Sequence, residues 1–145
     1  MYYTYFSNNL GSFEKERNDI NDLILLHNFA SLPETKCNND DCIDVLKLIA
    51  LKDLIEENKG AYISKFKNRR IIVENVYPIN QEKSIECIKE KIQQSSFPNN
   101  CGYFIVYDNL NNDKQSYIVS LPVSLYFSNT NEFRIGVLKL QGADR

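Results

Sequence analysis

Residues 40–60 read DDCIDVLKLIALKDLIEENKG, and they carry the strongest secondary-structure signal in the chain. Apolar residues recur here at helical spacing, in a stripe broader than a surface helix requires. They are Ile43, Leu46, Ile49, Ala50 and Leu54 on one face, joined by Val45, Leu48, Leu51 and Ile55. Asp40 and Asp41 are placed to cap this helix, and Gly60 is placed to end it. We therefore predict a central, buried helix.

An earlier helix is expected to begin at Asp19 and to stop near Pro33. Its apolar stripe comprises Ile20, Leu23, Ile24 and His27, joined by Leu26 and Ala30. His27 is the only histidine in the chain, and its place on this stripe predicts a core position. With its only histidine expected in the core, the chain offers no standard catalytic set that could be built around it.

The remainder of the chain is expected to be mainly extended. Residues 61–66 and 69–77 form a predicted hairpin around a tight turn at Lys67 and Asn68. A third helix follows Asn80, with Ile85, Ile88 and Ile92 on its buried side. Residues 102–107 are apolar on both alternating faces, which predicts a central strand parallel to residues 69–77. The last predicted strands are residues 115–121, 123–127 and 133–140, and Pro122 restricts its strand to an edge, a bulge or a bend.

These elements predict one α+β domain over residues 1–145. Its sheet is mixed, mostly antiparallel and of about five strands, packed by two N-terminal helices and one crossover helix. The length of 145 residues is enough for one core, and the 43% hydrophobic and 25% charged fractions are those of a soluble globular protein.

Composition also limits compartment and partners. The net charge of -2 predicts no binding of polyanions by the whole molecule. The first residues lack the features of a secretory signal, and no apolar run is long enough to span a membrane, so we expect a cytoplasmic protein without membrane contact. For a domain of this size in that compartment, the four cysteines are expected to be free thiols.

An enzyme built on cysteine is one alternative. Cys37 and Cys42 have the spacing of half a zinc site, but Cys87 and Cys101 do not supply the other half. A nucleophilic Cys101 would need His27 as its base. No glycine-rich phosphate loop is present either, so we expect no cofactor, no metal and no catalysis.

Acidic side chains cluster at both ends of the predicted central helix. Asp40, Asp41 and Asp44 are accounted for by helix capping, because acids near a helix N-terminus are stabilising. Glu56 and Glu57 run against that preference near the helix end. Together these five residues predict an acidic partner-binding face.

The alternative contact is the basic segment Lys65, Lys67, Arg69 and Arg70, which contains no acid. A basic hairpin tip can meet phosphates, and residues 71–76 (IIVENV) resemble the first-strand motif of RNA-recognition motifs. The resemblance covers six residues and implies an RNA-binding module. Ile72 stands where that family has a stacking aromatic residue, and the later aromatic strand motif is missing.

The leading hypothesis is a non-catalytic protein-binding module. Nine tyrosines and eight phenylalanines are more than one small core needs, and aromatic side chains dominate interface energetics. Small size, acidity and the absence of catalytic motifs are typical of inhibitors, such as a bacterial immunity protein or a phage or viral antagonist. The expected partner is another protein, such as a basic enzyme or nuclease toxin, and the sequence indicates no oligomeric state.

Overall fold

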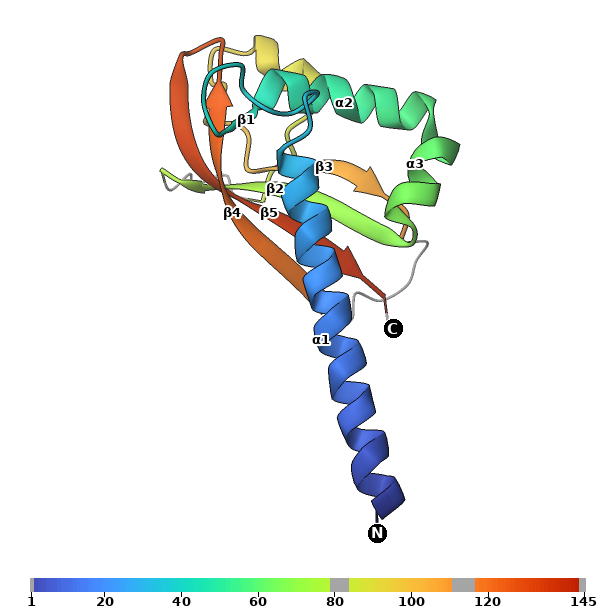
Figure 1. The fold of residues 1–145 in the computed structure, drawn as a ribbon. Helices are drawn as coiled ribbons and strands as arrows, with labels where there is room; N and C mark the ends of the chain where they lie inside the picture. The colour runs from blue at the N-terminus through green and yellow to red at the C-terminus, as the bar shows by residue number, and fades with distance from the viewer. Residues whose placement is uncertain (1, 79–83, 111–116, 144–145) are drawn as a thin grey trace.

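The computed structural model describes residues 2–78, 84–110 and 117–143, and for the N-terminal half of the first helix it describes the side chains of residues 11 and 14 onward. The elements in chain order are α1 (Tyr2–Ala30), β1 (Ile43–Asp44), α2 (Val45–Glu57), α3 (Lys59–Phe66), β2 (Arg69–Tyr77), the 3-10 helix η1 (Lys89–Gln93), β3 (Tyr103–Asp108), β4 (Tyr117–Phe127) and β5 (Glu132–Gly142) (Figure 1). The predicted α+β class is confirmed. Among the described helices, none is both long and apolar enough to cross a membrane.

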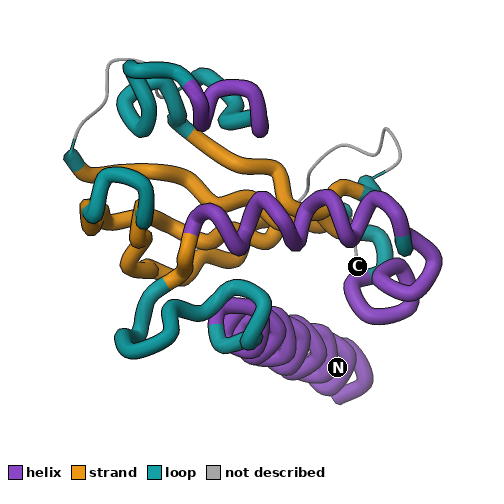
Figure 2. The backbone as a smooth tube through the Cα atoms, turned by 90° about the horizontal axis from the view of Figure 1, so that it is seen from above, coloured by secondary structure: helices purple, strands orange, loops and turns teal. Residues whose placement is uncertain are grey.

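The five strands form one sheet in the order β1-β4-β5-β2-β3. Only β1 and β4 are parallel, and the other neighbours are antiparallel, as the sequence predicts for a mixed, mostly antiparallel sheet. The helices α1 and α2 lie on one side of the strands (Figure 2). The core lies between them and the strands, where Leu125, Leu138, Leu140 and Ile71 are fully buried.

The prediction that residues 102–107 form the central strand is wrong. β3 is the last strand in the sheet order, and β5 lies at the centre. The register between β2 and β3 shifts at Ile71 and Ile72, so that the consecutive residues Val106 and Tyr107 are both buried. A bulge of this kind makes an edge strand appear apolar on both faces.

The predicted crossover between β2 and β3 is also wrong, because the two strands are antiparallel. Residues 79–83, at the start of the predicted third helix, lie outside the described residues. Beyond them only η1 is helical, while Glu86 forms a parallel bridge with Tyr103. The segment leading to β3 covers the core through Phe97, whose ring lies 5.5 Å from that of Phe127.

The central helix is confirmed as α2, which buries Val45, Leu48, Ile49, Leu51 and Ile55, whereas Ala50 and Leu54 of the predicted main face are exposed. It ends at Glu57 with Asn58 as its cap, and Gly60, the predicted end, lies within α3. The start of α2 differs from the prediction, because Asp44 and not Asp40 or Asp41 is the cap. Residues 61–66 continue as the helix α3, where a strand was predicted. This helix places Tyr62 and Phe66 one turn apart with stacked rings, and Phe66 then packs on Phe29 and Tyr107.

The first helix is longer than predicted, beginning at Tyr2 instead of Asp19, and its N-terminal half projects away from the sheet (Figure 1). The side chains that face the body are Asp22, Leu26 and Phe29. Of the predicted apolar positions, Leu26 and Ala30 pack on the core as expected. The others are exposed: Ile20 is 56% exposed and Ile24 52%, and His27 lies at the surface. The prediction of a core histidine is therefore wrong.

The positions of one glycine and one proline in the sheet follow from their neighbouring strands. Gly136 of β5 lies between β4 and β2, and a Cβ atom there would come within 2.6 Å of Leu125 Cδ1 and 2.8 Å of the Glu74 carbonyl oxygen. Pro122 of β4 pairs with Val137 on one side, whereas β1 reaches only Leu125 and Tyr126 on the other. Pro122 thus lies in a part of β4 that pairs with a described strand on one side only, and an edge was one of the places predicted for it.

Candidate protein-binding surface

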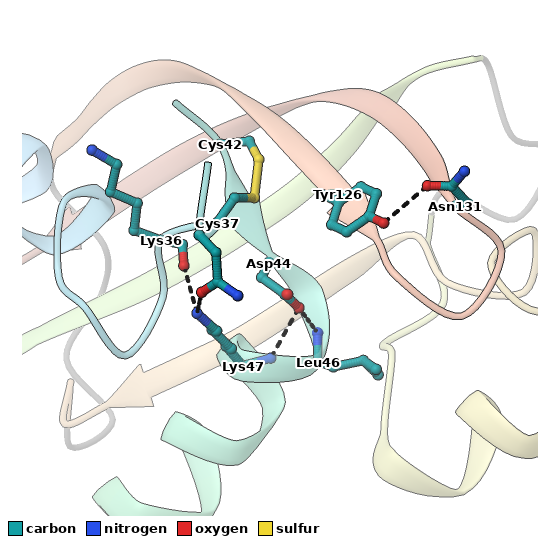
Figure 3. Close-up of a disulfide and its surroundings, with 9 residues drawn as sticks. Lys36, Cys37, Cys42, Asp44, Leu46, Lys47, Tyr126 and Asn131 are labelled. Atoms are coloured by element: carbon teal, nitrogen blue, oxygen red, sulfur yellow. Dashed lines mark hydrogen bonds between the residues drawn. A yellow bond between two sulfur atoms is a disulfide. The ribbon is translucent and has the colours of Figure 1, made fainter. Parts of the chain in front are cut away.

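A disulfide between Cys37 and Cys42 closes a short loop in front of α2 (Figure 3). The Cα atoms of these cysteines are 5.4 Å apart, and the Cys37 amide also donates to the Cys42 carbonyl at 2.9 Å. Lys47 fixes the loop from the helix side, because its Nζ donates to the Lys36 carbonyl at 3.0 Å and to Asn38 Oδ1 at 2.8 Å. The loop is therefore held in one shape while Asp40 and Asp41 at its tip remain exposed.

Asp44 serves α2 directly. Its Oδ1 accepts hydrogen bonds from the Leu46 amide at 3.0 Å and the Lys47 amide at 3.3 Å (Figure 3). These bonds satisfy two of the amides that a helix N-terminus leaves without partners. Of the three predicted acids at this end, one is a structural cap and two are available for contacts.

An aromatic pair adjoins this loop. Asp44 is in register with Tyr126 of β4, and Tyr126 is in register with Phe133 of β5. The two rings lie 4.8 Å apart at an angle of 35°, and the Tyr126 hydroxyl donates to Asn131 Oδ1 at 2.9 Å. Phe133 nevertheless leaves 54% of its surface exposed. An exposed phenylalanine on a rigid strand, braced by a second ring, can enter a pocket of another protein.

The disulfide-closed loop and the rings of Tyr126 and Phe133 border a depression of about 330 Å³. Its lining residues are Cys37, Asn38, Asn39, Asp40, Asp44, Tyr126, Asn131 and Phe133. We call the exposed loop residues 38–41 together with Tyr126 and Phe133 the aromatic–acidic surface. Apolar exposure continues from it onto the sheet at Ile135, which is 55% exposed and in register with Tyr77.

The other predicted acids lie elsewhere. Glu56 and Glu57 are exposed at the C-terminal end of α2, and a helix of 13 residues is about 20 Å long. Glu56 there lines a separate depression with Lys52, Lys59 and Glu86, so its surroundings carry both signs of charge. The structure does not bring the five predicted acids together.

Two of the four predicted basic residues have acidic partners. Arg69 Nη2 lies 2.7 Å from Asp22, whose side chain is 1% exposed, and Arg70 Nη2 lies 3.0 Å from Asp108. Lys65 lies over the Phe66 ring at 5.6 Å, and Lys67 is exposed in the turn after α3. The predicted hairpin tip is thus a helix end and a turn, with both arginine charges already paired.

The prediction of free thiols is wrong, because Cys87 and Cys101 form a second disulfide and no described cysteine is free. The parallel bridge between Glu86 and Tyr103 brings these distant cysteines to a Cα separation of 4.6 Å. With its sulfur bonded, Cys101 cannot act as a nucleophile, nor can Cys37 and Cys42 bind zinc as thiolates. In the parts of the chain that the structure describes, no group of three or more potential ligands is placed to hold a metal ion.

The sequence pattern predicts only the acidic residues of the aromatic–acidic surface. Its acids were singled out from their clustering, but Tyr126 and Phe133 were not, although the high aromatic content was a signal that some rings would be exposed. Comparison with known proteins adds no further assignment, because no family model, no curated protein and no solved structure matches this chain.

Proposed function

We propose that this chain is a non-catalytic protein-binding module that contacts its partner through the aromatic–acidic surface. The observation that carries the proposal is the exposed Phe133, which packs against the Tyr126 ring beside a loop that a disulfide closes. Aromatic anchors surrounded by polar residues are typical of interface hot spots. Because the loop is already ordered, binding would cost little conformational entropy.

The charges on this surface favour a basic partner. Asp40 is exposed in the depression beside the aromatic pair, and Asp41 is the next exposed residue of the loop. The Lys47 ammonium lies on the helix side of the loop, where it donates to Asn38. Exposed acids of this kind accelerate encounter with a protein of opposite charge. An inhibitor or immunity protein that neutralises a basic enzyme, such as a nuclease toxin, fits this chemistry, as does a phage or viral antagonist.

The two disulfides favour an oxidising compartment for this encounter over the cytosol that the sequence predicts. Disulfides persist in secreted and periplasmic proteins and are rare where thiol reductants are abundant. We therefore propose that the partner is met in such a compartment.

The test is affinity capture with four immobilised forms of the full chain: the wild type, Phe133→Ser, the double variant Asp40→Lys with Asp41→Lys, and Ile118→Ser. Ile118 is the matched control, because it is also an exposed apolar residue of the sheet, 46% exposed. A protein captured by the wild type is identified by mass spectrometry, and its affinity for each form is then measured.

We expect the Phe133 variant to bind at least about 30-fold more weakly, the usual effect of losing a hot-spot residue. The lysine variant should associate more slowly at low salt, with a difference that shrinks at high salt. A partner that binds the Phe133 and Ile118 variants equally well contradicts the proposed surface.

A further inference from the structure

The helix α1 has two distinct faces. One packs on the body of the protein through Leu26 and Phe29, and its Asp22 pairs with Arg69 of β2. The opposite face is apolar but uncovered, with Ile20 56%, Leu23 41% and Ile24 52% exposed. This face adjoins the aromatic–acidic surface at one point, because His27 and Asp41 line the same depression. Its exposed apolar residues Ile20, Leu23 and Ile24 belong to neither the loop nor the aromatic pair, so a partner on them goes beyond the proposed function and is tested by different substitutions.

The spacing along the uncovered face is that of a coiled coil. His27, Ile24, Ile20 and Arg17 are separated by three, four and three residues, and all four are exposed. Towards the N-terminus the sequence continues this alternation at Phe13, Leu10, Phe6 and Tyr3. A strict alternation of three and four averages 3.5 residues, the period at which two supercoiled helices keep one seam in contact. We call the four exposed positions with described side chains, Arg17, Ile20, Ile24 and His27, the α1 seam.

The projecting part of α1 also needs a partner on energetic grounds. A helix of 29 residues is about 43 Å long, and its N-terminal half extends beyond the sheet (Figure 1). Most helical stability in proteins comes from packing an apolar face and not from intrinsic propensity. The sequence of this half includes Gly11 and several asparagines, which are weak helix formers.

We infer that the α1 seam is covered by the same seam of a second copy of this chain, in a parallel two-stranded coiled coil. Arg17 and Ile24 then occupy heptad position a, and Ile20 and His27 occupy position d. The side chains that pack on the body, Leu26 and Phe29, lie on the opposite side of the helix from Ile20 and Ile24. His27, at the end of the seam, adjoins the body, where it lines a depression with Asp41 and Pro122.

Charge complementarity favours a second copy in parallel register. Arg17 is the one basic residue of the α1 seam apart from His27, and the exposed Glu16 precedes it at heptad position g. In a parallel pair, the hole that receives an a residue is bordered by the preceding g residue of the other helix. Each Arg17 therefore meets Glu16 of the second copy, which compensates both charges. A single polar a residue also fixes register at some cost in stability.

The experiment measures the mass of the full chain by sedimentation equilibrium over a range of protein concentrations. We expect the wild type to be a dimer that dissociates on dilution. The double variant Ile20→Lys with Ile24→Lys should weaken the dimer at least about 100-fold, since two apolar contacts are lost from each helix. Its matched control is Leu54→Lys with Ile63→Lys, which replaces two similarly exposed residues of α2 and α3, at 42% and 38%, and should leave the dimer intact.

A charge exchange tests the register. Arg17→Glu alone places two glutamates together and should weaken the dimer, whereas Glu16→Arg combined with Arg17→Glu should restore it. Thermal unfolding confirms that each variant is folded. A wild type that is monomeric throughout, or a dimer that survives the Ile20 and Ile24 substitutions, overturns the inference. Failure of the charge exchange to restore association overturns the parallel arrangement.

Discussion

The hydroxyl of Tyr107 joins β3 to the turn that follows α3. It donates to the Lys67 carbonyl at 2.6 Å, and the ring packs against Phe66 with centroids 5.2 Å apart. Burial raises the pKa of Tyr107 above its ordinary value of 10.0, although Asn109 and Arg69 act in the opposite direction. The folded protein therefore favours the neutral hydroxyl more strongly than the unfolded chain does.

Tyr107→Phe is expected to lower the free energy of unfolding at neutral pH by about 1 kcal/mol, the usual contribution of one hydrogen bond. The difference from the wild type should diminish as the pH rises. Because the Tyr107 pKa is higher in the folded protein, the unfolded chain loses this proton first, from about pH 10 upward. The stability that the neutral hydroxyl contributes is therefore complete below pH 10 and is lost as the pH rises through the folded-state pKa. Urea unfolding of both proteins from about pH 7 to about pH 11 measures this change.

Tyr77→Phe is the matched control for this prediction, because Tyr77 is 60% exposed and the substitution should leave stability at neutral pH unchanged. A wild-type advantage that stays constant up to the highest pH would contradict the assigned role of burial at Tyr107.

Asp22 explains why the buried face of α1 was not predicted. Sequence patterns assign apolar residues to the core, yet here a carboxylate is 1% exposed while Ile20 and Ile24 are at the surface. The compensation comes from Arg69, which lies 47 residues later in the chain (69 minus 22) and pairs at 2.7 Å. Local spacing carries no information about a partner so distant in the sequence, so the helix was predicted but its orientation was not.

At the scale of elements, the order of the strands predicts which amides exchange most slowly. β5 is paired on both sides by β4 and β2, whereas β3 has a full strand neighbour only on one side. In hydrogen exchange we expect the amides of Leu138 and Leu140 to be the best protected and those of β3 to exchange faster. Amides in β3 that exchange more slowly than those in β5 would contradict the observed order.

Local patterns predicted the elements that are long and one-sided. The wide apolar stripe of α2 and the alternation in β2 and β5 were sufficient, because burial there follows the period of the element. β4 was predicted as two strands divided at Pro122, but it is one continuous strand that pairs with β5 along its whole length. Local patterns failed at α3, where eight residues are too few to separate the two periods and where ring packing by Tyr62 and Phe66 decides the conformation. They failed again at β3, since a bulge alters the alternation.

For the molecule as a whole, the two disulfides are expected to contribute unequally to stability. They join cysteines with sequence separations of 14 and 5. On loop-closure entropy alone, replacing Cys87 and Cys101 by alanine should cost about 3 kcal/mol, and replacing Cys37 and Cys42 about 2 kcal/mol. Guanidinium unfolding of the two double variants measures the difference, and the non-reduced wild type should contain no cysteine that reacts with an alkylating agent. Four reactive thiols would contradict both bonds.

The aromatic–acidic surface could be predicted only in part, because its residues are far apart in the sequence, as Asp22 and Arg69 are. Clustering in the sequence identifies Asp40 and Asp41, but their neighbours Tyr126 and Phe133 come from strands more than 80 residues later (126 minus 41 is 85). The sheet register is what places the rings beside the loop. Spacing also grouped Glu56 and Glu57 with these acids, although the length of α2 separates them.

The crowding at Gly136 has an evolutionary consequence. A Cβ atom at this position would meet the Glu74 carbonyl oxygen of the neighbouring strand at 2.8 Å, and a backbone atom in a paired strand cannot move aside as a flexible side chain does. The flanking Ile135 has no such restriction, because it is more than half exposed. In related proteins that keep this sheet, we therefore expect glycine at position 136. At position 135, packing within the sheet imposes no such choice, and the residue there is selected only for what its exposed side chain contacts.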